Sequence, residues 1–144
     1  MTNVVLRKGA AYALICLMLF MIFAAPIYAA GAQCSANISR TPISANLSTA
    51  PMPDGTGNFR KGESVFVNLG ATTHYKLDSC TIYLKTPGDD NYRFVGTYNP
   101  SGYFRYCYFE LTPSDTGTYN VRIEVINTDG AVASANLGFK LEDS

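Results

Sequence analysis

The side chains in this sequence with the most evident chemistry are four cysteines. They are Cys16, Cys34, Cys80 and Cys107. No two of them form a Cys-x-x-Cys pair, and His74 is the only histidine in the chain. These residues do not match the ligand sets typical of zinc, so we expect no metal site and no cofactor. What remains is thiol and disulfide chemistry, which depends on the compartment in which the protein resides.

The first 32 residues have the pattern of a secretory signal peptide. Arg7 and Lys8 form a short positive region, an apolar run occupies residues 10–25, and Ala30-Gly31-Ala32 offers a small-residue cleavage site. An uncleaved membrane anchor is the alternative, because the apolar stretch is also long enough to span a bilayer. Cleavage would leave three cysteines in a secreted, periplasmic or cell-surface protein, where disulfides persist.

Beyond residue 33 the sequence predicts β-strands and no helix. The clearest strand is 118–126, in which Tyr119, Val121, Ile123 and Val125 alternate with polar residues, as in a half-buried strand. A first edge strand is expected within the extended segment 33–58. The expected strands, separated by turn-forming residues, are 42–49, 61–69, 80–85, 92–98, 103–111, 118–126 and 132–141. This pattern predicts a single antiparallel β-sandwich of about seven strands over residues 59–144.

Two motifs resemble those of immunoglobulin-like domains. Asp115-Thr116-Gly117-Thr118-Tyr119 resembles the tyrosine corner, in which the tyrosine hydroxyl bonds to backbone a few residues upstream. Lys61-Gly62-Glu63-Ser64-Val65 is similar to the beginning of the second strand in that superfamily. The resemblance covers about residues 61–141 and implies an immunoglobulin-like sandwich. Leu69 and Val121 stand where the usual cysteine pair would be, and tryptophan is absent, as in some looser relatives from bacterial surface proteins.

The parity of the strands suggests a disulfide. Cys80 shares its face with Ile82, and Cys107 shares its face with Phe109, so both cysteines should point into the core from opposite sheets. A Cys80–Cys107 bridge would contribute about 3–4 kcal/mol on the chain-entropy argument. Two buried free thiols, or a bridge from Cys34 to either cysteine, are the alternatives. An unbridged Cys34 could be a capped thiol or could form an intermolecular disulfide.

The same parity predicts an aromatic surface. Four aromatic side chains are expected to point outward from two neighbouring strands: Phe66, Phe104, Tyr106 and Tyr108. A contiguous aromatic patch is a candidate binding surface, because tyrosine offers a large contact area at low entropic cost. The alternative is that segment 33–58 folds over the patch and covers it.

Composition and charge narrow the function classes. The chain has a formal net charge of zero and no basic stripe, which argues against nucleic acid as a partner. The single histidine lies outside any catalytic motif, so we expect a non-enzymatic binding or adhesion module that recognises a protein, a glycan or another copy of itself. One alternative is a structural subunit of a surface assembly, joined through residues 33–58 and Cys34. Another is a small enzyme inhibitor that uses the loop at residues 99–103.

Overall fold

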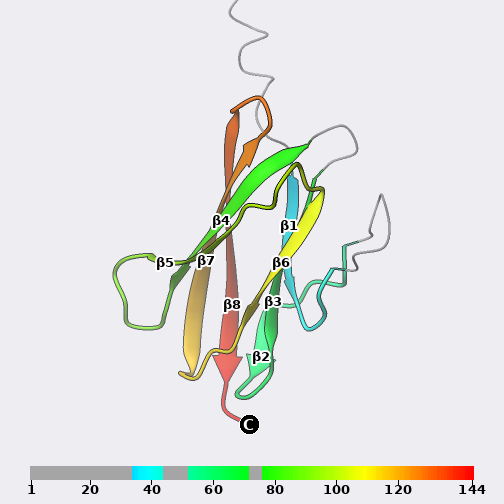
Figure 1. The fold of residues 1–144 in the computed structure, drawn as a ribbon. Helices are drawn as coiled ribbons and strands as arrows, with labels where there is room; N and C mark the ends of the chain where they lie inside the picture. Colours follow the sequence, from blue (N-terminus) through cyan, green and yellow to red (C-terminus); the bar gives the residue numbers. More distant parts are fainter. Residues whose placement is uncertain (1–33, 44–51, 72–75) are drawn as a thin grey trace, which may run out of the picture. The chain divides into compact units, whose positions relative to one another are not determined.

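The computed structural model describes residues 34–43, 52–71 and 76–144, which belong to one compact unit, Ala32–Ser144. These ranges contain eight strands (Figure 1): β1 (Cys34–Ser39), β2 (Asn58–Arg60), β3 (Val65–Ala71), β4 (Leu77–Lys85), β5 (Arg93–Tyr98), β6 (Tyr106–Leu111), β7 (Gly117–Asn127) and β8 (Val132–Glu142). They hold no helix that is long and apolar enough to cross a membrane. The predicted leader lies outside the described residues.

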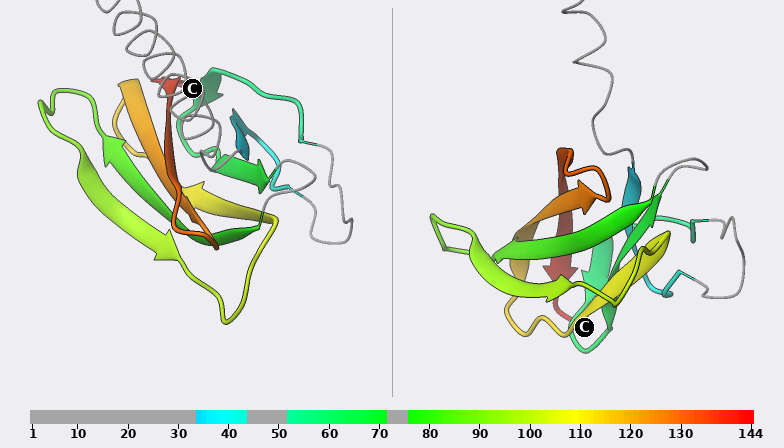
Figure 2. Two further views of the ribbon diagram at one scale, coloured as in Figure 1. Left: turned by 90° about the horizontal axis from the view of Figure 1, so that it is seen from above. Right: turned by 45° about the horizontal axis from the view of Figure 1, so that its top comes forward.

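The strands form two sheets that pack face to face as separate layers (Figure 2). One sheet has three strands in the order β1-β3-β6, and the other has five in the order β2-β8-β7-β4-β5. Neighbouring strands are antiparallel except β2, which runs parallel to β8. The prediction of an all-β sandwich is confirmed.

The core lies between the sheets and follows the period-two pattern of the sequence. On β7 the side chains of Tyr119, Val121, Ile123 and Val125 are buried, and the residues between them lie on the outer face. Burial of each apolar side chain of this size contributes about 1.5–3 kcal/mol to the free energy of folding. The buried side chains that produce this alternation therefore also help to hold the two sheets together.

The corner that precedes β7 has the predicted geometry. The hydroxyl of Tyr119 donates to the backbone oxygen of Asp115 (2.7 Å) and accepts from its backbone N–H (3.2 Å). Gly117 has a φ of 135°, and a Cβ at this position would lie 2.8 Å from the ring carbons of Pro87. Glycine is therefore required both by the backbone conformation and by the space available. The tyrosine corner, a hallmark of immunoglobulin-like sandwiches, is present.

Strand order also matches that architecture. In chain order, β4, β5, β7 and β8 take the places of strands C, C′, F and G, while β1, β3 and β6 take those of A, B and E.

The N-terminal strands differ from the prediction. The first strand is β1 at 34–39, whereas the sequence predicted one at 42–49; residues 42–43 are irregular, and 44–49 lie outside the described residues. Apolar and polar residues alternate in both 34–39 and 42–49. It is the first of these segments that pairs with β3, with Ala36 and Ile38 opposite Leu69 and Val67. Short β2 was not predicted, because three residues are too few to show a period.

Candidate functional site

The outer face of the three-stranded sheet carries an aromatic pair, one ring of which is exposed. Val65 and Val67 on β3 are buried, so Phe66 between them projects outward, as predicted. Tyr108 on β6 also projects outward and is 49% exposed. The two rings meet edge to face, with centroids 5.8 Å apart and an interplanar angle of 70°. This is a favourable aromatic geometry, in which Phe66 is half-buried and Tyr108 is the more exposed of the two rings.

The other two predicted aromatic residues are placed differently. Tyr106 lies on the same face of β6 as Tyr108 and is half-buried. Phe104 is only 7% exposed, so the prediction that it belongs to the exposed surface is wrong. Strand β6 begins at Tyr106, and the alternation of the strand does not extend back to Phe104. That ring instead packs edge to face against Tyr98, with centroids 4.9 Å apart. We refer to Phe66, Tyr106 and Tyr108 together as the β3–β6 aromatic surface.

Beside this surface, the outer face of the same sheet is covered. Asn68 has the same outward parity as Phe66, yet it is fully buried. Its Nδ2 donates to Ser39 Oγ (2.9 Å) and to the carbonyl oxygen of Thr41 (3.2 Å), and its Oδ1 accepts from the backbone N–H of Ile43 (2.7 Å). The side chain of Ile43 is itself buried. The alternative, in which the N-terminal segment covers this face, is therefore found at Asn68, whereas Tyr108 is 49% exposed.

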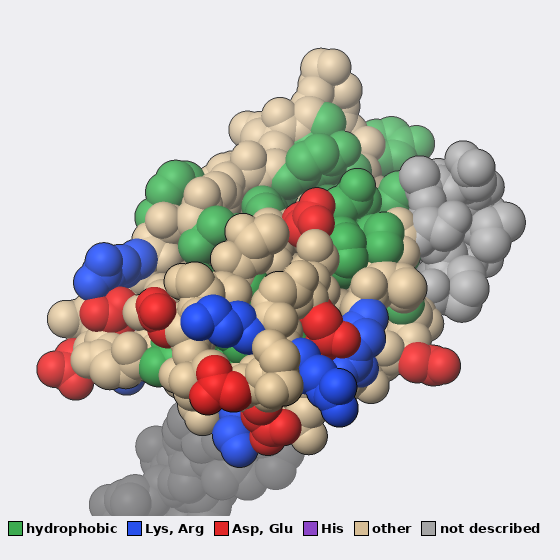
Figure 3. Space-filling model, turned by 90° about the horizontal axis from the view of Figure 1, so that it is seen from below, with side chains coloured by type: hydrophobic (Ala, Val, Ile, Leu, Met, Phe, Trp, Pro, Cys, Tyr) green, Lys and Arg blue, Asp and Glu red, His purple; other side chains and the backbone are tan. Residues whose placement is uncertain are grey.

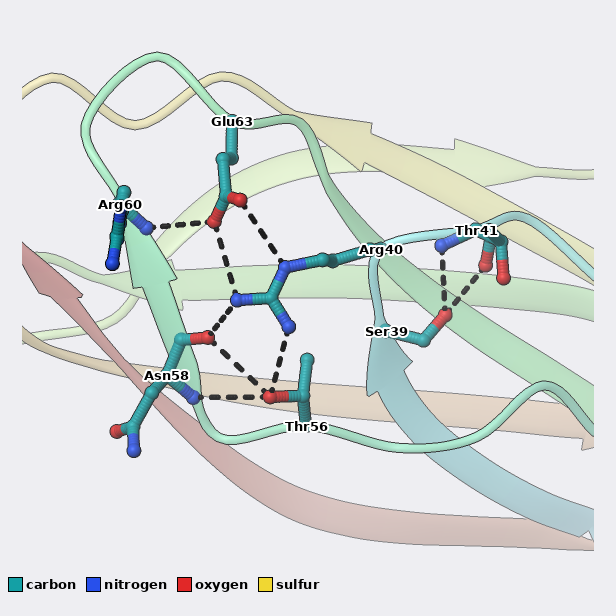
Figure 4. Close-up of polar contacts among 7 residues, drawn as sticks. All are labelled: Ser39, Arg40, Thr41, Thr56, Asn58, Arg60 and Glu63. Atoms are coloured by element: carbon teal, nitrogen blue, oxygen red, sulfur yellow. Dashed lines mark hydrogen bonds and ion pairs between the residues drawn. The ribbon is translucent and has the colours of Figure 1, made fainter.

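A polar cluster fixes the chain where β1 ends (Figure 4). The guanidinium of Arg40 donates to Glu63 (3.2 Å), to the backbone oxygen of Asn58 (2.7 Å) and to Thr56 Oγ1 (3.4 Å). The backbone N–H of Arg60 also donates to Glu63 (2.7 Å), and these bonds hold the pKa of the Glu63 carboxyl below its ordinary value. The cluster ties β1 to the turn after β2. Because it is largely solvent-exposed, we assign it to positioning rather than to chemistry.

A second aromatic cluster lies on the outer face of the five-stranded sheet. Tyr83 on β4 meets Phe94 on β5 edge to face, with centroids 6.1 Å apart, and Phe94 is 64% exposed. Arg122 on β7 stacks over Tyr83 at 4.6 Å and over Tyr92 at 5.1 Å. Alternation along β4 places Tyr83 on the face opposite buried Ile82, but the cluster itself depends on the β4–β5 and β4–β7 pairings, which join residues far apart in the chain.

Exposed apolar side chains are not spread evenly. On the face shown in Figure 3 they gather in one area, while the Lys, Arg, Asp and Glu side chains lie mainly in another. The exposed large hydrophobic residues come from β5, β6 and the turns next to them, and from the β7–β8 hairpin: Phe94, Val95, Tyr98, Tyr103, Tyr108, Ile126 and Val132. Tyr103, in the loop considered for inhibition, carries Lys76 over its ring at 4.2 Å.

The cysteines lie in the core, as the parity argument predicted for two of them. Cys80 and Cys107 are buried, and the thiol of Cys80 is hydrogen-bonded to that of Cys107. The predicted disulfide between them is not formed in this structure, in which both are free thiols. This hydrogen bond and burial raise the pKa of Cys80. Cys34 is partly buried against the same core, and its pKa is raised by burial and by the neighbouring Cys80.

Metal ligands are not gathered in the part of the chain that the structure describes. Within it, no group of three or more His, Cys, Asp or Glu side chains is placed to hold a metal ion. His74 lies outside the described residues. The described residues provide exposed aromatic side chains and free thiols.

Comparison with known proteins places the fold but not the function. No family model and no curated protein matches the chain. Among solved structures, a variant of the superoxide reductase (neelaredoxin) from Ignicoccus hospitalis is 12% identical at a TM-score of 0.56, over 83% of this chain and 87% of that one. A putative superoxide reductase from Thermotoga maritima is 10% identical at a TM-score of 0.51, over 60% and 81%. At these identities the likeness shows a shared fold alone.

Proposed function

We propose that this chain is an exported, non-enzymatic binding module that captures a protein or glycan partner through the β3–β6 aromatic surface. The observation that carries the proposal is the edge-to-face pair of half-buried Phe66 and exposed Tyr108 on an outer sheet face. Both side chains are presented by strands of the packed sandwich. The rigid backbone reduces the entropy lost when a partner orders them.

Polar groups beside the pair are already held in place. Glu110 lies opposite Phe66 in the β3–β6 register, and its carboxylate accepts a hydrogen bond from Ser64 Oγ (2.7 Å). An aromatic contact area flanked by fixed hydrogen-bonding groups is the usual composition of a protein interaction surface. It also suits sugars, which combine apolar ring faces with hydroxyls.

The cluster on the other sheet is less suited to this role. Arg122 stacks on the ring faces of Tyr83 and Tyr92, so these aromatic groups are engaged within the chain. Among the described residues, no lysine or arginine is stacked on Phe66 or Tyr108. The β3–β6 aromatic surface is therefore the better candidate for contact with a partner.

The alternative of an assembly subunit has less support. It would join copies through the N-terminal segment and Cys34, but residues 34–39 form β1 within the chain's own sandwich. Cys34 is partly buried against the core of the same unit. These two observations favour the binding module.

The test compares matched pairs of substitutions on the two sheets. Wild type, Phe66→Thr/Tyr108→Thr and the control Tyr83→Thr/Phe94→Thr are applied to a glycan array and to a panel of extracellular proteins. Threonine keeps the β-propensity of each position. We expect the first variant to lose at least about 30-fold in affinity for any ligand that wild type binds, as for interface hot spots.

The control should retain most of that affinity, and circular dichroism should show an unchanged fold in both variants. Equal binding by wild type and the Phe66→Thr/Tyr108→Thr variant would contradict the proposal. So would an equal loss in the control.

A further inference from the structure

Three thiols from three strands face the same interior. Cys107 is paired with Leu69, and Cys34 is paired with Ala71, two residues further along β3. Opposed residues in a ladder share a face, and Leu69 is buried, so both cysteines project between the sheets. Cys80 projects from the opposite sheet and is hydrogen-bonded to Cys107. Cys34 packs against the same core cluster, which contains Cys80.

The three thiols differ in their access to solvent. Cys80 has no exposed surface and Cys107 is 5% exposed, whereas Cys34 is partly exposed at the beginning of β1. Strand β1 is also an edge strand of its sheet, paired with β3 alone. A dissolved oxidant therefore meets Cys34 before it can meet the buried pair.

We propose that Cys34 is the acceptor thiol of a relay that oxidises the buried Cys80–Cys107 pair. The oxidant is a small-molecule disulfide, such as oxidised glutathione. In the first step the Cys34 thiolate attacks one sulfur of that disulfide, a mixed disulfide forms, and one small thiol leaves after taking up a proton.

In the second step the Cys80 thiolate attacks the Cys34 sulfur and releases the second small thiol. In the third, the Cys107 thiolate attacks the Cys80 sulfur, which forms the Cys80–Cys107 bond and returns Cys34 to its thiol form. The balance is two electrons: two protein thiols are oxidised, and one small disulfide is reduced to two thiols. Cys80 is the central thiol because it projects from β4, in the opposite sheet, into the core against which both Cys34 and Cys107 pack.

The relay ends in a cross-link between the two sheets, and its thiol–disulfide exchange is slow. The final bond joins β4 to β6 and so cross-links the two sheets. The pKa values of Cys34 and Cys80 are raised, so few thiolates of these two residues are present near neutral pH, and the first two exchange steps are slow. Intermediates should therefore accumulate long enough to be trapped with acid.

The experiment follows oxidation of the reduced full chain, carrying Cys16→Ser, by oxidised glutathione. Samples are quenched with acid, and peptides are identified by mass spectrometry. We expect a transient glutathione adduct at Cys34, followed by a Cys80–Cys107 disulfide with Cys34 free. The further substitution Cys34→Ser should slow formation of that disulfide by about tenfold or more. Cys107→Ser should stop the reaction at a Cys34–Cys80 bond.

Ser35→Ala, next to Cys34 on β1, is the matched control and should oxidise like the parent. Melting temperatures are recorded for each variant, and Cys34→Ala replaces Cys34→Ser if the latter does not fold. Oxidation of the Cys34 variant at the parental rate would overturn the relay. A stable adduct or dimer at Cys34, with Cys80 and Cys107 still reduced, would overturn it as well.

Discussion

Replacing Asn68 by alanine tests how the N-terminal segment is held on the outer face of the three-stranded sheet. The amide of Asn68 joins β3 to three separate parts of that segment, through Ser39 Oγ, the Thr41 carbonyl and the Ile43 N–H. It also donates to Asn37 Oδ1 at 3.3 Å. Alanine removes every one of these bonds at once.

The cost is estimated from the partners that are left behind. The backbone N–H of Ile43 loses its acceptor in a buried setting, which costs about 1–3 kcal/mol. The Thr41 carbonyl keeps its bond from Ser39 Oγ, so its loss is smaller. The space left by the missing amide adds about 1 kcal/mol. We therefore expect a loss of about 3 kcal/mol in the free energy of unfolding, or about 10 °C in melting temperature for a domain of this size.

Urea unfolding followed by circular dichroism measures this loss, with linear extrapolation to water. Asn136→Ala, at an exposed asparagine on the outer face of β8, is the control and should be close to neutral. A change of less than about 0.5 kcal/mol for Asn68→Ala would refute the reasoning, because it would mean that the buried amide does not hold the segment.

Two further sites give predictions of their own. Tyr119→Phe should cost about 1–2 kcal/mol, since it removes both hydrogen bonds to Asp115, and calorimetry would show it. Burial raises the pKa of Tyr119, so the stability that its hydroxyl contributes is fully present below about pH 10 and is lost as the pH rises through the raised pKa. Above that pH the unfolding curves of wild type and Tyr119→Phe should converge. Gly117→Ala should lower the free energy of unfolding by about 3 kcal/mol, because of the φ of 135° and the close approach of a Cβ to Pro87. Gly57→Ala is the control and should lower it far less, since there is open space around Gly57. Equal losses in the two variants would contradict this account.

The β3–β6 aromatic surface shows which side-chain positions the alternation of a strand can predict and which it cannot. Phe66 and Tyr108 lie within regular strands, so alternation placed them correctly on the outer face. Phe104 lies two residues before β6, where the chain pairs with Leu77 through an isolated bridge, and its ring turns inward. Alternation predicts which face a residue occupies only within a strand. The residue at which a strand begins depends on its pairing with the neighbouring strand.

By itself, the sequence determined the elements that depend on neighbouring residues. The period of two on β7, the Asp115–Tyr119 corner and the inward positions of Cys80 and Cys107 are local patterns, and each is found in the structure. Only the tertiary structure decided the pairing of β1 with β3 and the burial of Asn68 beneath the segment around Ile43. The same holds for the packing of Cys34 against the core that contains Cys80. These features join residues far apart in the chain, and their stability comes from hydrogen bonds and burial that exist only after the sheets have packed.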